Sequence, residues 1–381
     1  MWSPAGYPVG QLVADLLAAG SAALGTALTR PSDLGGSDRS KVLRCHLPAG
    51  GTVVIKSYPP TADGAEGLAA EAAGLAFCAR TGLGPELLAV DAAARLIVMA
   101  DLGDAPSLAD LLLGQSADAA ERALLDWVRA CGRLAASTAG RRPEFAQLRS
   151  GYLAAQADLD GADEHWLARR IGMIPGLLSG LGIGVPGGLA GDLAAVLTLL
   201  GTSFEVFSPG DICPDNNLIT ADGVRFVDYE SAEFHSVFLD AAYLRMPFSS
   251  CWCVFRLPGR LARAAESCYR DHVCAIYPQL ADDQRWEAGV RLAMAAWTLH
   301  AMSYLLDRSM LADKHMHDLR RPVPTARQLL RFRWRRLADE LAAAGELSAL
   351  AETTERLLAA TWHWATDDLP VYPAFRAPLA S

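Results

Sequence analysis

Residues 208–234 read SPGDICPDNNLITADGVRFVDYESAEF, and polar side chains flank both of its short apolar runs. Asp211 and Asn216 are five residues apart and precede the first run. The pair Asp222–Gly223 predicts a tight turn into a second run that ends at Asp228. Because such a hairpin brings its two ends together, we expect the two carboxylates and the amide to lie close to one another.

Phosphoryl transfer to a hydroxyl group uses this set of side chains. One carboxylate orients the attacking hydroxyl and accepts its proton, while an asparagine and a second carboxylate hold Mg²⁺ on the nucleotide phosphates. A lone Asp-x4-Asn motif is also typical of an ordinary surface turn, so the interpretation depends on further elements in the right order.

The first hundred residues supply these elements. Val42–Leu47 and Thr52–Tyr58 predict two strands joined by the turn Pro48–Gly51, and the second of them carries Lys56. Glu71 follows on an Ala-rich predicted helix, where its carboxylate could pair with the lysine. The turn before these strands contains small residues whose backbone N–H groups suit phosphate binding: Gly35, Gly36 and Ser37.

In this order and spacing, the motifs resemble the aminoglycoside phosphotransferase-like (choline kinase-like) family of small-molecule kinases. The resemblance implies a bilobal, protein-kinase-like α+β fold and a kinase that uses ATP and Mg²⁺. It implies that Asp211 is the catalytic base and that Asn216 and Asp228 are the metal ligands. It also implies a set of nucleotide-binding residues: Gly35, Gly36, Ser37, Lys56, Glu71, Ala100 and Leu102.

The change in composition along the chain predicts the domain boundaries. We expect a nucleotide-binding lobe over residues 1–99, a hinge at 100–104, and a helical lobe with the catalytic loop and acceptor site over 105–381. In the last of these, Asp240 resembles the aspartate that anchors the catalytic loop of the family.

Two positions depart from the family pattern. Pro209 stands where the family has a histidine that braces the metal-binding segment, and Glu230 stands where a glycine is found in related motifs. The alternative function is therefore a catalytically silent nucleotide-binding or scaffold protein. Lys56, Asp211 and Asp228 all remain, which favours the enzyme.

Composition limits the partners and the location. The chain has 381 residues and a net charge of −9, which gives no electrostatic basis for binding nucleic acid. Its eight cysteines form no paired CxxC array, so we expect reduced thiols and a cytoplasmic protein. The uncharged stretch 171–191 contains prolines and many glycines, so it predicts a flexible loop rather than a membrane span. The oligomeric state is left open.

Acceptor and metal questions remain open at this level. The acceptor is a small-molecule hydroxyl compound, for which aminoglycosides, other amino sugars, choline-like alcohols and antibiotic intermediates are candidates. Gly176–Gly191 and Asp367–Asp368 are candidate acceptor-binding segments. One further cluster lacks the usual zinc-knuckle spacing, so core packing is favoured over a zinc site: Cys251, Cys253, Cys268, His272 and Cys274.

Overall fold

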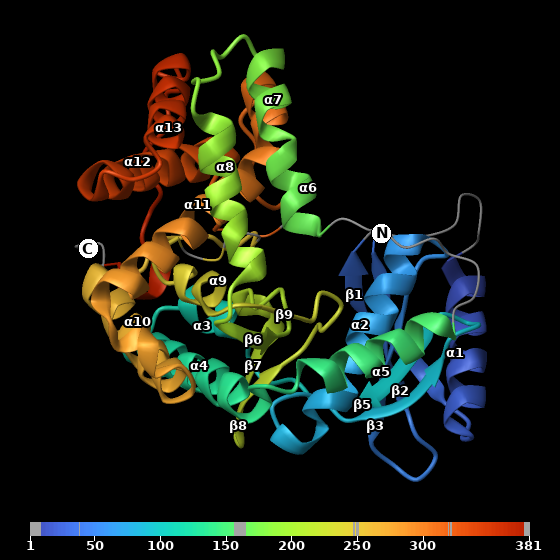
Figure 1. Cartoon of the computed structure of the whole chain (residues 1–381). Helices are drawn as coiled ribbons and strands as arrows, with labels where there is room; N and C mark the ends of the chain where they lie inside the picture. Colours follow the sequence, from blue (N-terminus) through green and yellow to red (C-terminus); the bar gives the residue numbers. More distant parts are fainter. Residues whose placement is uncertain are drawn as a thin grey trace.

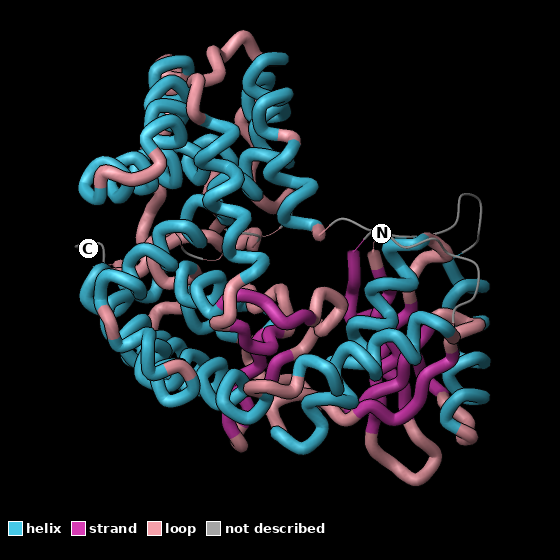
Figure 2. The backbone as a smooth tube through the Cα atoms, in the orientation of Figure 1, coloured by secondary structure: helices cyan, strands magenta, loops and turns pink. Residues whose placement is uncertain are grey.

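The chain folds into two lobes, a small lobe built on one antiparallel sheet and a larger, mainly helical lobe (Figure 1). Figure 2 shows that the strands lie in the small lobe and at the border between the lobes, while helices and their connecting loops form the remainder. The computed structural model describes residues 9–37, 39–155, 165–246, 248, 251–318, 320 and 322–376.

The small lobe contains five strands in the order β1-β2-β3-β5-β4, and every neighbouring pair is antiparallel. Its elements are α1 (Val9–Leu24), β1 (Thr29–Ser37), β2 (Ser40–His46), β3 (Thr52–Ser57), α2 (Ala62–Cys78), η1 (Ala79–Thr81), β4 (Leu87–Asp91) and β5 (Leu96–Ala100). The hairpin of β2 and β3 confirms the sequence prediction, with Val42 opposite Lys56.

The two helices of the small lobe cover opposite faces of the sheet. Successive side chains of a strand point to opposite faces, and Ile55 packs in a core that includes Leu12 and Leu16 of α1. The next residue, Lys56, therefore points toward α2, on the same face as its cross-strand partner Ile97. Strand periodicity thus directs the lysine toward the helix that carries Glu71.

The large lobe begins with helices and includes two short strand pairs, β6 with β9 and β7 with β8. Its first elements are α3 (Leu108–Leu112), α4 (Ala117–Thr138), α5 (Arg142–Ala154), α6 (Trp166–Gly172), α7 (Ile174–Gly180), α8 (Leu189–Leu197) and η2 (Thr198–Gly201). The central elements are β6 (Glu205–Ser208), η3 (Pro214–Asn216), β7 (Asn217–Thr220), β8 (Gly223–Phe226), β9 (Glu233–Ser236) and α9 (Val237–Ala242). The last elements are α10 (Gly259–Ile276), η4 (Pro278–Ala281), α11 (Asp283–Leu311), α12 (Ala326–Ala344), α13 (Ser348–Ala360) and η5 (Pro373–Phe375).

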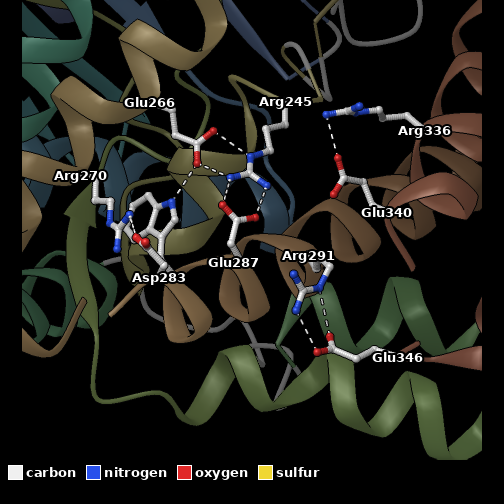
Figure 3. A network of polar contacts seen from close by, with 10 residues as sticks. Arg245, Glu266, Arg270, Asp283, Glu287, Arg291, Arg336, Glu340 and Glu346 are labelled. Atoms are coloured by element: carbon white, nitrogen blue, oxygen red, sulfur yellow. Dashed lines mark hydrogen bonds and ion pairs between the residues drawn. The ribbon is translucent and has the colours of Figure 1, made fainter. Parts of the chain in front are cut away.

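Helix α11 is the centre of the large lobe and packs against α6, α7, α8, α9 and α12. Arg245, just after α9, links α10 to α11 through two carboxylates, one on each helix (Figure 3). Its guanidinium lies 2.5 Å from Glu266 and 2.6 Å from Glu287, and Trp286 donates its indole N–H to Glu266 at 2.8 Å. These contacts fix the segment that follows Asp240.

Four phenylalanines form a shared core where the lobes meet. Phe77 of α2 lies with its ring centroid 5.6 Å from Phe145 of α5 and 5.0 Å from Phe207 of β6. Phe234 of β9 completes the group at 5.9 Å from Phe77. Aromatic burial of this kind stabilises the contact between the lobes.

The prediction of a flexible loop over residues 171–191 is wrong. This stretch contains the end of α6, all of α7 and the start of α8, and its buried side chains include Ile171, Ile174 and Leu178. Packing of this apolar face against α11 outweighs the low helix propensity of the glycines. Among the described residues, no helix combines the length and the apolar character that crossing a membrane requires.

Candidate active site

Lys56 is the centre of a cluster of charged side chains between the lobes. Its Nζ lies 2.5 Å from Oε2 of Glu71 on α2 and 2.5 Å from Oδ1 of Asp228 after β8. Glu230 adds a third carboxylate at 3.1 Å. Burial alone would lower the pKa of Lys56, but Asp228 and Glu71 raise it well above its ordinary value. The lysine is therefore a fixed cation.

Glu71 is held from a second side. The hydroxyl of Tyr58 donates to Oε2 of Glu71 at 2.8 Å, and the glutamate side chain is only 1% exposed. Tyr58 was not identified from the sequence, although its spacing of two residues from Lys56 near the end of β3 places both side chains toward the same face. That spacing is the signal that could have identified it.

The candidate catalytic loop follows β6, and Asn216 links its two ends. The side-chain NH₂ of Asn216 donates to the backbone carbonyl of Asp211 at 2.9 Å, and the backbone carbonyl of Asn216 accepts from Val227 N–H at 2.9 Å. Since Val227 directly precedes Asp228, the loop and the end of the β7–β8 hairpin are adjacent. The neighbouring Asn217 is fully buried, and its side chain bonds to the carbonyls of Ile212 and Cys213.

Gly210 allows the loop to approach the segment after β8. Its φ is +86°, and a Cβ at this position would lie 2.0 Å from the backbone oxygen of Ser231. Only glycine permits both this backbone conformation and this approach. The residue before Asp211 therefore fixes the loop against the segment that carries Asp228.

Asp228 has an unusual backbone for a residue with a side chain, with φ at +68°. Burial opposes its ionisation, but Lys56 holds the pKa of this carboxyl below its ordinary value. Oxygen atoms of Glu71, Asp228 and Glu230 lie within 4.8 Å of one another. Carboxylate oxygens are donors that suit a hard cation such as Mg²⁺, and in this structure the same three carboxylates surround Nζ of Lys56.

The glycine-rich segment differs slightly from its prediction. Gly35 and Gly36, with φ of +100° and +129°, and Ser37 are the last residues of β1 and not the turn itself. The turn contains Arg39, whose guanidinium lies 3.1 Å from Glu230. No sequence motif indicates a role for Arg39, because its partner Glu230 is distant in the chain. This ion pair brings the tip of the β1–β2 hairpin to the segment that carries Asp228.

The predicted hinge is anchored to the sheet by Asp101. Its carboxylate accepts from Thr52 Oγ1 at 2.6 Å and lies 2.6 Å from Arg44 Nε. The N–H of Ala100 donates to Glu86 O at 2.9 Å. An adenine contact through that amide would break this bond, so Leu102 is the stronger candidate of the two predicted hinge donors.

Asp240 anchors the start of the catalytic loop. It accepts from Ser208 Oγ at 3.3 Å, and Ser208 Oγ in turn accepts from Gly210 N–H at 3.2 Å. His235 Nε2 lies 2.9 Å from the same carboxylate. Thus an imidazole from β9 binds the aspartate that anchors this loop. His235 was missed because it lies outside the motif.

His235 is charged because two carboxylates surround it. Burial opposes its protonation, but Asp240 and then Glu233 raise its pKa to about 10. Nδ1 of His235 lies 3.6 Å from Glu233, which also lies 3.3 Å from His165 and accepts from the indole of Trp166 at 3.1 Å. This chain of contacts connects the catalytic loop with the start of α6.

The two candidate acceptor segments have intramolecular contacts. In Gly176–Gly191, the carbonyl of Gly184 accepts from Arg356 of α13 at 2.8 Å, and in Asp367–Asp368 the second carboxylate lies 2.6 Å from Arg335 of α12. Figure 1 shows the α7–α8 connection at the far end of the large lobe, away from β6 and β7. The predicted covering loop therefore lies against α13.

No model of a protein family matches the chain, and no curated protein sequence matches it. Solved structures are similar to it. A choline/ethanolamine kinase family protein from Mesorhizobium loti has a TM-score of 0.50 at 16% identity, over 91% of this chain and 99% of that one. Choline kinase from Cryptosporidium parvum Iowa II also has a TM-score of 0.50, at 11% identity over 84% and 91% of the two chains. The chain therefore has the fold of the choline and ethanolamine kinases, which is the protein-kinase-like fold that its sequence predicts.

Proposed function

We propose that this chain is a kinase that transfers the γ-phosphate of ATP to a hydroxyl group of a small molecule. The observation that carries the proposal is the position of Lys56, whose ammonium bridges Glu71 of α2 and Asp228 of the large lobe at 2.5 Å each. A lysine held by a helix carboxylate beside a metal-binding aspartate is the arrangement that phosphoryl transfer uses to bind ATP phosphates.

Each residue has a distinct role in the proposed reaction. Asp211 accepts the proton of the acceptor hydroxyl as its oxygen bonds to the γ-phosphorus, and the bond from that phosphorus to the leaving oxygen of ADP breaks. Lys56 binds the phosphates, and Glu71 with Tyr58 fixes its position. The backbone of Gly35, Gly36 and Ser37 covers the phosphates.

Asn216 and Asp228 are the proposed ligands of Mg²⁺, and Glu230 is close enough to assist. When bound, the ion would neutralise part of the phosphate charge. The low pKa of Asp228 keeps this ligand ionised at neutral pH, as a hard cation requires. The side chain of Asn216, bonded to the Asp211 carbonyl, couples the position of this site to that of the base.

The acceptor remains a class rather than a compound. The similar structures include choline and ethanolamine kinases, so amino alcohols belong in the first set tested together with aminoglycosides and other amino sugars. Purified chain is incubated with Mg·ATP and each compound, and a phosphate-sized mass gain on the compound is sought by mass spectrometry.

The control is the Asp211→Asn variant, which keeps the shape of the side chain and loses the proton acceptor. A phosphorylated product that forms with the native chain and drops at least about 100-fold with this variant supports the proposal. Nucleotide binding without transfer to any compound, unchanged in the variant, would instead indicate the silent binding protein.

A further inference from the structure

Three cysteine thiols from two separate segments meet beside the catalytic loop. Cys213 lies in the loop itself, between the proposed base and the proposed metal ligand, while Cys251 and Cys253 precede α10. The sulfur atoms of Cys251 and Cys253 are 2.9 Å apart, and all three side chains are at most 2% exposed. The fold thus brings a distant thiol to a Cys-x-Cys pair.

A carboxylate completes this group. Oδ1 of Asp215 lies 3.5 Å from Cys251 Sγ, and ligand atoms of Cys213, Asp215 and Cys251 all lie within 4.8 Å of one another. Cys253, whose sulfur is 2.9 Å from that of Cys251, lies outside this mutually close set and becomes a fourth ligand once its side chain turns toward the other three. Four ligands of sulfur and oxygen are the usual complement of a structural zinc site.

The carboxylate has a fixed orientation. The indole N–H of Trp252 donates to Oδ2 of Asp215 at 2.6 Å, which leaves Oδ1 toward the thiols. Trp252 is itself packed, with its ring centroid 5.6 Å from that of His317 and 4.6 Å from the guanidinium of Arg320. Hydrogen bonds that orient a ligand from behind are a regular feature of metal sites.

The distances fit a metal after small side-chain movements. Zinc–sulfur bonds of about 2.3 Å in a tetrahedral site place two sulfur atoms about 3.8 Å apart. The 2.9 Å separation of Cys251 and Cys253 has to widen by roughly 1 Å, and the spacings among Cys213, Asp215 and Cys251, all within 4.8 Å, have to contract by no more than roughly 1 Å. The same separation is longer than the bond of about 2.05 Å in a disulfide.

The sequence had grouped Cys251 and Cys253 with other residues. Cys268, His272 and Cys274 lie on α10, where His272 Nδ1 contacts the carbonyl of Cys268 at 2.8 Å. Within the described ranges, the clusters able to hold an ion contain none of these three. Ordinary core packing explains buried thiols, but it does not explain why an oriented carboxylate faces them.

We propose that Cys213, Asp215, Cys251 and Cys253 bind one zinc ion, which fastens the catalytic loop to the segment before α10. Each thiol that becomes a ligand releases its proton to solvent. The site is separate from the proposed magnesium site, whose ligands are all oxygen atoms. Zinc binding also does not depend on phosphotransfer, so the two proposals can fail independently.

The test measures bound metal in tag-free full-length chain. Protein refilled with zinc and then dialysed against a weak chelator should retain about one zinc ion per chain, as determined by mass spectrometry of the elements. Cys213→Ser and Cys251→Ser should each retain less than about a tenth of this amount. Two controls should keep the full zinc content: Cys268→Ser, a cysteine outside the cluster, and Asp228→Ala, a ligand of the other proposed site.

Cobalt provides a measurement on the native chain, which stays informative if a variant does not fold. Co²⁺ replacing zinc should give the intense near-ultraviolet absorption of thiolate ligation and the visible bands of tetrahedral geometry. The proposal would be overturned if the native protein retains no zinc after refilling and shows none of these bands with Co²⁺. A titration of the unfolded native chain that finds two fewer free thiols than its eight cysteines would also overturn the proposal, because that result indicates a disulfide. Zinc lost in Cys268→Ser but kept in Cys213→Ser would overturn it as well.

Discussion

Lys56 and Asp228 are 172 positions apart in the chain, yet Nζ of the lysine lies 2.5 Å from Oδ1 of the aspartate. The lysine belongs to the sheet of the small lobe and the aspartate to the large lobe, so this ion pair crosses between the lobes. The stability of the contact between the lobes and the proposed binding of nucleotide therefore depend on the same ammonium group.

Replacing Lys56 by Met should destabilise the fold strongly. The change leaves Glu71 buried without its cation, and breaking a buried pair from one side costs about 3–5 kcal/mol. Burial raises the pKa of Glu71 even beside Lys56. Because the pKa of Glu71 is higher in the folded chain than in the unfolded chain, protonation of Glu71 reduces the destabilisation of the variant at low pH. The variant's loss of unfolding free energy should therefore grow as pH rises from about 5 to 8. Urea unfolding across this range measures the effect.

Lys41→Met is the matched control for Lys56→Met. Lys41 is also a buried lysine of the same sheet, but its partner Asp33 is 48% exposed and can be hydrated when the lysine is removed. If Lys41→Met loses as much unfolding free energy as Lys56→Met, the burial of Glu71 without its cation does not explain the effect.

Asp211→Asn should reduce kcat by about 100-fold or more and leave the affinity for ATP nearly unchanged, because only the proton acceptor is lost. Asp222→Asn, at the exposed turn between β7 and β8, is the control and should have normal kinetics. Steady-state assays with the identified acceptor give both constants. Normal turnover in Asp211→Asn would assign proton transfer to another group.

Asp228→Ala should abolish the dependence of ATP affinity on Mg²⁺, since the proposed ligand with the lowered pKa is lost. Calorimetric titration with ATP, with and without Mg²⁺, is the measurement. The same Mg²⁺-dependent gain in affinity in the variant and the native chain would remove Asp228 from the metal site.

His235 should make stability depend on pH in the alkaline range. Its pKa of about 10 in the folded chain exceeds the ordinary value of 6.5, so its contribution is complete below pH 6.5 and is lost as pH rises toward about 10. The slope from one such group is at most about 1.4 kcal/mol per pH unit. His235→Gln should flatten the decline in the free energy of unfolding over this range.

His300→Gln is the control for His235→Gln. Burial and then nearby arginines lower the pKa of His300 to about 3, so this buried histidine is neutral throughout the alkaline range. The alkaline slope of His300→Gln should equal that of the native chain. An unchanged slope in His235→Gln would show that the imidazole next to Asp240 is not the titrating group.

Gly210→Ala should be much more harmful than Gly223→Ala. Both glycines have positive φ, which costs a substituted residue about 1–3 kcal/mol. At Gly223 a Cβ meets nothing within 4 Å, whereas at Gly210 it meets the backbone oxygen of Ser231 at 2.0 Å. The Gly210 variant must shift the loop that carries Asp211, so kcat should fall together with the melting temperature. Equal effects of the two substitutions would argue against a close approach at Gly210.

The sequence predicted the elements that carry the candidate site residues, because local spacing determines those elements. Strand periodicity placed Lys56 toward α2, and the Asp222–Gly223 turn correctly joined the two runs of the β7–β8 hairpin. The roles of Asp211 and Asn216 remain predictions. The predictions that depend on local spacing, namely the strand of Lys56 and the β7–β8 hairpin, agree with the structure.

The misses depended on contacts between distant segments. Cys251 and Cys253 were grouped with neighbours in sequence, but the fold brings Cys213 to them. His235 and Arg39 have no motif, since their meaning comes from Asp240 and Glu230. The glycine content of residues 171–191 predicts a loop, but packing against α11 stabilises helix in this stretch.

Helix α5 follows α4 in the chain but lies against α2, where Arg149 of α5 is 2.5 Å from Glu66 of α2. Twelve of the seventeen residues of α2 are buried, and Phe77 near its end shares the aromatic core with Phe145 of α5. A fragment that stops at residue 104 would thus expose an apolar flank of the helix that carries Glu71. Recombinant halves divided there should aggregate when expressed separately and recover solubility when produced together, because the second half supplies the missing cover.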